Sequence, residues 1–197
     1  MRDDVIGHLH GGPQEQSSLL TAGVPYGPGT LEWQTETMPS PRCHLAQINI
    51  ARILAPLDSP VMAGFVSQLQ AINALAERSP GFVWRLQTPE GDATAVRAFD
   101  DPRVLLNITV WESVEALKNF TYGGSHLAAY RDRAKWFEPP TEAYLALWWI
   151  PAGHLPDVKE AIERLQYRRE HGDTAEAFSF AKPHPPPEAP SAKAAAP

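Results

Sequence analysis

The sequence predicts an α+β fold, in which helices pack against an antiparallel sheet, and three observations support this. Strand-like and helix-like segments alternate along residues 43–181. Hydrophobic residues make up 43% of the 197 residues, which is enough for one folded core. Eleven of the twenty prolines lie outside 43–181. We therefore expect an irregular N-terminal arm (1–42), one α+β domain (43–181) and a disordered tail rich in proline and alanine (182–197).

The first half of the domain predicts a strand, a helix and a second strand. Residues 43–53 are rich in β-branched side chains and predict a strand. Ser59, followed by proline, predicts a helix N-cap, and apolar residues then recur at helical spacing over 62–72. Pro80-Gly81 ends this helix, and residues 82–87 predict a short strand.

The second half repeats this order. Residues 104–111 alternate strictly and predict the strongest strand. Ser113 predicts the N-cap of a short helix, and a further helical segment is expected over 125–137. Residues 144–150 predict another strand, and residues 156–170 predict a helix.

The core of this order is β-α-β-β-α-β, which is the split βαβ arrangement of ferredoxin-like folds. The segments 95–99 and 177–180 are weaker strand candidates beside it. Such a fold has an antiparallel sheet with helices on one face, so the other face must meet something apolar. We expect a homodimer in which two sheets meet face to face and form a dimeric α+β barrel with a lumen.

Composition and charge exclude several classes of protein. The net charge of −6 comes without a basic patch, which disfavours a nucleic-acid partner. The single cysteine, Cys43, excludes an internal disulfide framework. No apolar run approaches the ~18 residues of a membrane span, and the N-terminus lacks the apolar stretch of a signal peptide. We therefore expect a cytoplasmic protein with no membrane partner.

Strand alternation places polar side chains from three strands on one face of the sheet. Ala46, Ile48 and Ile50 share the face expected to meet the helices. The opposite face carries Gln47, Asn49, Arg85, Asn107 and Thr109. Pockets for organic ligands combine apolar or aromatic walls with a few polar groups, so this face predicts a small-molecule site in the lumen. The same pattern also fits polar residues solvated on an open sheet face.

The densest chemistry lies in the segment 125–137. If this segment is helical, His126, Tyr130, Arg133 and Phe137 share one face. His126 lies in the first helical turn, where the helix dipole favours a neutral imidazole. A neutral imidazole can ligate haem iron or act as a general base. The alternative is a half-buried structural histidine with tyrosine and arginine partners.

At these residues the sequence resembles a bacterial family of unknown function, DUF3291, which belongs to the dimeric α+β barrel group. The resemblance covers roughly residues 44–180. It is carried by His44-Leu-Ala-Gln-Ile-Asn-Ile, Val110-Trp111-Glu-Ser-Val-Glu-Ala-Leu, Phe120-Thr-Tyr122 with His126, Arg131-x-Arg133, Trp136-Phe137 and Leu147-Trp148-Trp149-Ile150-Pro151. It implies the ferredoxin-like fold and a homodimer.

The tract 111–137 also resembles spheroidene monooxygenase, which is linked to haem. More loosely, it is similar to antibiotic-biosynthesis monooxygenases, which need no metal or added cofactor. This resemblance implies a monooxygenase, an oxidoreductase that acts on an apolar or aromatic metabolite in the lumen, with haem as the candidate cofactor. The alternatives are a non-catalytic barrel that binds a ligand or haem, and a structural dimer whose tails recruit partners.

The oxygenase hypothesis assigns a role to each candidate residue. His126, Asn49 and Tyr130 are the catalytic candidates, and His126 is also the metal ligand if haem is bound. Arg85 and Arg133 are candidates to pair with a carboxylate such as a haem propionate. The expected substrate-binding residues are Asn107, Trp111, Tyr122, Trp136 and Trp148.

Overall fold

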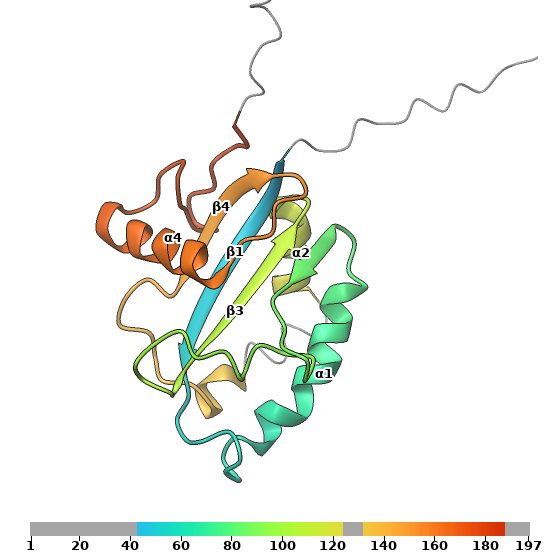
Figure 1. Cartoon of the computed structure of the whole chain (residues 1–197), viewed down its shortest axis with the longest axis vertical. Coiled ribbons are helices and arrows are strands. Elements are labelled where there is room, and N and C mark those ends of the chain that lie inside the picture. Colours follow the sequence, from blue (N-terminus) through green and yellow to red (C-terminus); the bar gives the residue numbers. More distant parts are fainter. Residues whose placement is uncertain (1–42, 124–131, 188–197) are drawn as a thin grey trace, which may run out of the picture. The chain divides into compact units, whose positions relative to one another are not determined.

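The computed structural model describes residues 43–123 and 132–187 (Figure 1). Within these residues the elements in chain order are β1 (Cys43–Arg52), α1 (Ala63–Glu77), β2 (Phe82–Arg85), β3 (Val104–Trp111), α2 (Val114–Tyr122), the short 3₁₀ helix η1 (Asp132–Lys135), β4 (Leu145–Pro151) and α4 (Val158–His171). None of the helices described is long and apolar enough to cross a membrane. The predicted arm, 1–42, lies outside the described residues.

The four strands form one sheet in the order β2-β3-β1-β4, and every neighbouring pair is antiparallel. With α1 between β1 and β2 and α2 between β3 and β4, this is the ferredoxin-like arrangement, which confirms the predicted fold class. β1 and β3 are central and pair along their whole length, from Leu45 opposite Trp111 to Arg52 opposite Val104. This register fixes which side chain of β3 lies directly opposite each side chain of β1.

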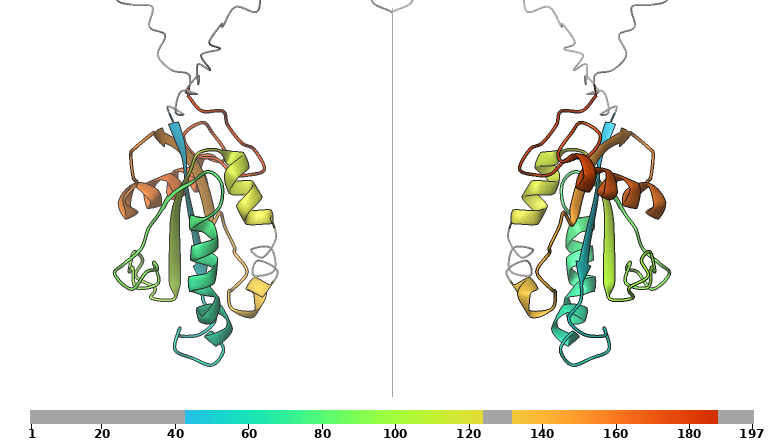
Figure 2. Two further views of the ribbon diagram at one scale, coloured as in Figure 1. Left: turned by 90° about the vertical axis from the view of Figure 1, so that its right-hand side faces the viewer. Right: turned by 90° about the vertical axis from the view of Figure 1, so that its left-hand side faces the viewer.

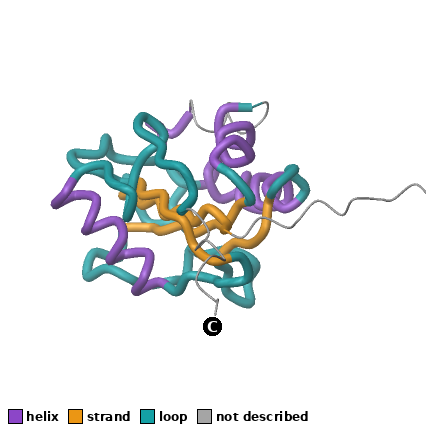
Figure 3. The backbone as a smooth tube through the Cα atoms, turned by 90° about the horizontal axis from the view of Figure 1, so that it is seen from above, coloured by secondary structure: helices purple, strands orange, loops and turns teal. Residues whose placement is uncertain are grey.

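Helices cover both faces of the sheet, which corrects the expectation that one face is left for a second copy. α1 and α2 lie on one side of the sheet and α4 lies on the other (Figures 2 and 3). α4 follows β4, so it is an addition to the β-α-β-β-α-β core. The chain itself therefore supplies the second layer that we expected from a dimer partner.

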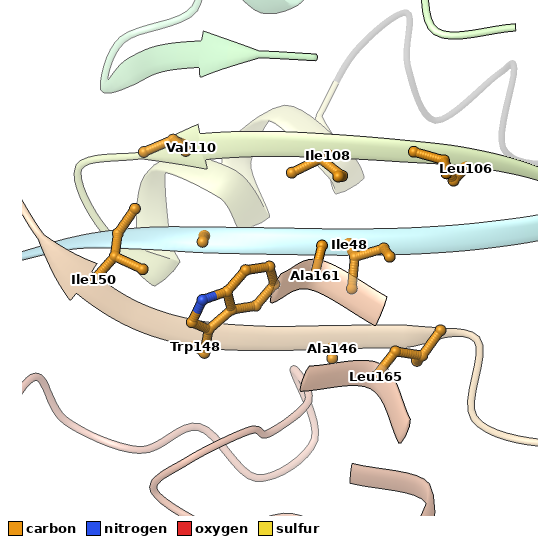
Figure 4. Close-up of a cluster of buried hydrophobic side chains, with 10 residues drawn as sticks. Ile48, Leu106, Ile108, Val110, Ala146, Trp148, Ile150, Ala161 and Leu165 are labelled. Carbon is orange, nitrogen blue, oxygen red and sulfur yellow. The ribbon is translucent and has the colours of Figure 1, made fainter. Parts of the chain in front are cut away.

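The α4 face carries the main apolar cluster (Figure 4). Its sheet residues are Ala46, Ile48, Leu106, Ile108, Val110, Ala146, Trp148 and Ile150, and Ala161 and Leu165 pack on them from α4. Side chains of the 86–99 segment complete the cover, among them Val96 and Phe99. Each sheet residue of the cluster is at most 4% exposed, so the chain covers this cluster without a second subunit.

The polar face meets helices of the same chain, which corrects its predicted position in a lumen between two sheets. Leu45 and Trp111 on this face pack with Ala76 of α1 and with Leu117 of α2. The expectation that Ala46, Ile48 and Ile50 meet a helix is confirmed, but the helix is α4. Alternation along a strand separates the two faces, whereas the identity of the covering helix depends on packing between distant segments.

The ends of several elements follow the sequence signals and others do not. Ser113 is the N-cap of α2, because its Oγ accepts a hydrogen bond from the Ala116 backbone N–H at 3.1 Å. Ser59 is not an N-cap: residues 59–62 form turns, and α1 begins at Ala63 after Met62. The predicted helix over 125–137 is described only from 132, where η1 ends at Lys135. Phe137 then forms a β-bridge with Ile53.

The segment after α4 folds back over β4. Phe178 and Leu147 exchange backbone hydrogen bonds of 2.8 Å, so the predicted strand over 177–180 is an isolated bridge. The His184 carbonyl accepts a hydrogen bond of 2.9 Å from Trp149 Nε1, so the first residues of the expected tail are held against the domain. The rest of the tail, 188–197, lies outside the described residues.

A half-buried ion pair stabilises this returning segment. Arg168 Nε contacts Asp173 Oδ1 at 2.5 Å, and the Ser179 hydroxyl donates to Asp173 Oδ2 at 2.7 Å. Burial raises the pKa of Asp173, but these hydrogen bonds and the charge of Arg168 outweigh burial and hold the pKa below its usual value.

Candidate functional site

A cavity of about 330 Å³ lies between the polar face of the sheet and the helices α1 and α2. Apolar side chains make up most of its wall, among them Phe65, Leu69, Ile72, Ala76, Leu117 and Phe120. The sheet contributes five polar residues, Gln47, Asn49, Arg85, Asn107 and Thr109, and the helices and loops contribute others such as Asn73. The volume falls in the range of pockets that hold small organic molecules, about 300–1,000 Å³.

The polar side chains on the sheet form one continuous hydrogen-bonded row. Trp111 Nε1 donates to Thr109 Oγ1 at 2.9 Å, and Thr109 Oγ1 donates to Gln47 Oε1 at 2.6 Å. Gln47 Nε2 donates to Asn49 Oδ1 at 2.7 Å, and Asn107 Nδ2 donates to the same oxygen at 3.1 Å. We call these five residues the polar row.

Strand register explains the polar row. Gln47 lies directly opposite Thr109, and Asn49 lies directly opposite Asn107, so both pairs are close enough for side-chain hydrogen bonds. The row is buried at one end and reaches the cavity at the other. Trp111 is fully buried and Thr109 is 5% exposed, whereas Asn49 and Asn107 are partly exposed and line the cavity.

Arg85 reaches the same face because of an irregularity in β2. Phe82 pairs with Trp111, Trp84 with Val110 and Arg85 with Thr109, so the register shifts around Val83. This bulge puts Phe82 on the cavity side, where its ring meets the Trp111 ring edge to face at 5.2 Å. Strict alternation along 82–87 would predict Phe82 on the face of Trp84, and the register shift is the reason that this prediction fails.

Arg85 is a buried cation with a partner at the end of α1. Its side chain is 10% exposed, and its Nε and Nη2 contact Glu77 Oε1 at 2.8 Å and 2.7 Å. The Glu77 side chain is 44% exposed, so it is the solvated member of the pair. The sequence analysis did not predict Glu77 as a site residue. No pattern in the sequence indicates that the last residue of a helix contacts a strand that follows a glycine turn.

The other predicted residues at the cavity come from beyond the strands. Tyr122, Arg133 and Trp136 all line it. The Arg133 guanidinium lies 5.1 Å from the centre of the Tyr144 ring, which is cation–π geometry. Trp136 stands beside Phe65 of α1, with ring centres 6.1 Å apart. Tyr144, directly before β4, also lines the cavity; it was not a sequence candidate, because it belongs to no motif.

Trp111 and Trp148 have different roles from those predicted. Trp111 lies beneath the cavity wall rather than in it, stacked on Phe120 with ring centres 5.1 Å apart. Trp148 lies on the opposite face of the sheet, where its Nε1 donates to Glu160 Oε1 at 2.9 Å. It pairs with Ala46 and therefore shares the face of Ala46, which corrects its predicted place in the wall.

His126 and Tyr130 lie outside the described residues, so their predicted roles stay predictions. Among the residues that the structure describes at the cavity, none is a histidine, cysteine or methionine, and the side chains of a kind that can ligate haem iron are the tyrosines Tyr122 and Tyr144. The described residues also hold no cluster of three or more metal-ligating side chains. The described part of the cavity therefore offers no histidine to a haem, and a histidine ligand would have to come from His126.

Three solved structures are similar to this chain at low sequence identity. SnoaB from Streptomyces nogalater, a cofactor-independent oxygenase, is 18% identical over 58% of this chain and 98% of its own, with a TM-score of 0.39. ActVA-Orf6 of Streptomyces coelicolor, a monooxygenase solved with nanaomycin D, is 17% identical over 59% and 96%, with a TM-score of 0.33. NE2512 from Nitrosomonas europaea, of unknown function, is 13% identical over 59% and 98%, with a TM-score of 0.38.

No protein of curated function matches this chain. The family model for the domain of unknown function DUF3291 matches residues 44–194, which covers the described domain and confirms the predicted resemblance. The chain belongs to the DUF3291 family.

Proposed function

We propose that this protein binds an apolar, aromatic small molecule in the cavity between the sheet and α1 and α2, and acts on it as a monooxygenase. One observation carries the binding part: a mostly apolar cavity of about 330 Å³ with the polar row along its sheet side. Aromatic rings such as Phe65 and Phe120 suit stacking with a planar ligand. The amides of Asn49 and Asn107 suit one polar edge of that ligand.

The proposed reaction rests on the catalytic residues that the sequence analysis predicted. A monooxygenase puts one atom of O₂ into the substrate and reduces the other to water with two electrons, which come from the substrate itself or from an external reductant. Asn49 and Asn107 would orient the substrate oxygen, and His126 would take the substrate proton. The apolar wall would exclude water from the reacting carbon.

Binding is tested with N-phenyl-1-naphthylamine, a neutral aromatic dye whose fluorescence rises in apolar sites. We expect saturable binding of one dye per chain. Ile72→Trp should abolish it by filling the cavity, because Ile72 lines the wall from α1. Val66→Trp is the matched control on the same helix, since Val66 is 42% exposed and does not line the cavity. Equal dye binding in both variants would overturn the proposed binding site.

Catalysis is tested with a panel of polycyclic phenols under ¹⁸O₂. We expect one ¹⁸O atom in the product, and a loss of turnover in Asn107→Ala that is absent in Asn119→Ala. Asn119 is an exposed residue of α2 outside the cavity. Tight binding without oxygen uptake across the panel would instead support the non-catalytic ligand-binding protein.

Haem is a separate question from the apolar ligand. Titration with haemin, followed by absorption spectroscopy, should give a sharp Soret band at one haem per chain if His126 supplies the ligand. His126→Ala should then weaken the band. Only the broad absorbance of free haemin would leave an oxygenase without haem or a binding protein.

The homodimer also stays a proposal, since a single chain does not test it. α1 and α2 already cover the polar sheet face that we expected a second copy to cover, and α4 and the 86–99 segment bury the opposite face. A dimer would therefore use a different surface. Light scattering on the purified protein decides the question: a monomer agrees with the self-covered sheet, and a dimer directs attention to another face.

A further inference from the structure

Each hydrogen bond of the polar row has a defined donor and acceptor. These roles determine which polar groups the asparagines at the cavity end of the row present to a ligand. An indole N–H can only donate, so Trp111 is a fixed starting point. Its donation occupies one lone pair of the Thr109 hydroxyl oxygen. The hydroxyl proton then points to Gln47 Oε1, at 2.6 Å.

The opposite orientation of Gln47 is disfavoured by burial. With its amide turned over, Gln47 would donate to the hydroxyl oxygen that already accepts from Trp111. The Thr109 proton would lose its acceptor, although Thr109 is 5% exposed and Gln47 8% exposed. A buried donor without an acceptor is strongly disfavoured, so the carbonyl of Gln47 faces Thr109.

The direction then passes to the two asparagines. Because its carbonyl faces Thr109, Gln47 donates from its NH₂ group to Asn49. Asn49 therefore accepts this hydrogen bond with its carbonyl oxygen. That oxygen accepts from Asn107 Nδ2 as well. Asn49 therefore turns its own NH₂ group away from the row, and Asn107 turns its carbonyl oxygen away.

We infer that Trp111 is a specificity-determining positioning residue: through the polar row it holds Asn49 as a hydrogen-bond donor to the cavity, so the position beside Asn49 selects a ligand group with an acceptor oxygen, such as a carbonyl or an ionised hydroxyl. This inference rests on the proposed binding function and names the chemical class of its ligand. Trp111 acts without touching the ligand, since it does not line the cavity. A ligand that offers only a donor at Asn49 would be rejected.

The test compares two planar tricyclic probes, 9-fluorenone and fluorene, which differ in one acceptor oxygen. Calorimetry should show that the full-length protein binds the ketone about three- to tenfold more tightly, the value of one hydrogen bond. Asn49→Asp replaces the donor with an oxygen and should reverse the preference. Asn119→Asp is the control with the same chemical change on the exposed side of α2, and it should keep the preference.

The role of Trp111 is tested by the same ratio. Trp111→Phe removes the fixed donor, and the ratio should fall toward one, because both orientations of Gln47 and Asn49 become accessible. Thr109→Val should have the same effect without removing a ring, and Thr109→Ser should restore the preference. A variant that merely loosens the domain would weaken both probes and leave the ratio unchanged, which would overturn the role of Trp111.

NMR of the ligand-free protein separates this inference from the proposed function. The side-chain NH₂ protons of Asn49 should exchange faster with water than those of Gln47, because only Gln47 uses them inside the row. Slow exchange at Asn49 with normal probe binding would refute the direction and keep the binding function. Failure of both probes to bind, with fast exchange at Asn49, would refute the apolar ligand class and keep the direction.

Discussion

Arg85 and Glu77 form an ion pair in which two guanidinium nitrogens contact one carboxylate oxygen, at 2.7 Å and 2.8 Å, beside the candidate ligand cavity. The arginine side chain is 10% exposed and the glutamate side chain 44%. Glu77 therefore neutralises a buried cation from the solvent side. The pair also ties the end of α1 to β2 across the turn at Gly81.

Removing the glutamate charge should change the preference of the cavity for anions. In Glu77→Gln, Arg85 keeps its charge without a counter-ion, so an anionic ligand near it gains attraction. We expect 8-anilinonaphthalene-1-sulfonate to bind roughly five- to tenfold more tightly, with little change for its uncharged analogue N-phenyl-1-naphthylamine. Fluorescence titration of both dyes measures this.

The matched control for that change is Glu163→Gln on α4. It removes the same charge from an exposed position on the helix that covers the other face of the sheet. An equal gain in sulfonate binding from Glu163→Gln would show a general charge effect rather than an effect of Arg85.

Leu165 should be essential for the layer that α4 forms on the sheet. It is 1% exposed and packs in the main apolar cluster. Leu165→Ala should lower the free energy of unfolding by about 2–5 kcal/mol, because it leaves a cavity under α4. Leu155→Ala is the control, since Leu155 is 48% exposed. Urea denaturation measures both, and similar midpoints for the two variants would contradict the packing of α4.

Gly81 should tolerate no side chain. It has φ +78°, and an added Cβ would lie 2.6 Å from the Ala116 Cβ of α2. Gly91 has φ +92° with no atom within 4 Å of an added Cβ, so Gly91→Ala isolates the backbone effect, about 1–2 kcal/mol. Gly81→Ala should lower thermal stability by more than Gly91→Ala. Equal melting temperatures would show that α2 shifts to accommodate the methyl group.

The ion pair of Arg168 and Asp173 should make stability depend on pH in the acid range. The pKa of Asp173 is lowered in the folded state, so its carboxylate stabilises the fold at pH values above its unfolded pKa of about 3.9. This contribution is lost as the pH falls through the lower folded pKa. Asp173→Asn should lower the free energy of unfolding at pH 7 by about 1.5–3 kcal/mol, the value of its charged hydrogen bonds.

The difference between Asp173→Asn and wild type should therefore shrink toward pH 3, as measured by urea denaturation at several pH values. Asp58→Asn, at an exposed position, is the control. A difference that stays constant from pH 7 to pH 3 would show that the effect of Asp173→Asn comes from packing and not from the charge.

The cavity face of the sheet could be predicted because strand alternation is a local property. Gln47, Asn49, Asn107 and Thr109 share one face as expected, and they form hydrogen bonds with one another. The fold class could be predicted for a similar reason, since the order of strands and helices allows few sheet topologies.

Long-range packing explains what could not be predicted. Nothing local to 156–170 says which face of the sheet α4 covers. The register that puts Trp148 on the face of Ala46 is likewise set by pairing between distant strands. The pairing of Arg85 with Glu77 depends on a bulge at Val83, which is a departure from regular geometry rather than a pattern in the residues. Tyr144 reaches the cavity from a strand end, where no motif marks it.

The position of α4 has a consequence for how the protein responds to dilution. A sheet covered by a partner loses its cover when the partner becomes scarce, whereas α4 is tethered to β4 by a short connection at 152–157. The cover therefore acts at a high effective concentration that does not depend on the number of protein molecules present. The main apolar cluster should stay closed in a cell that makes only a few copies of this chain.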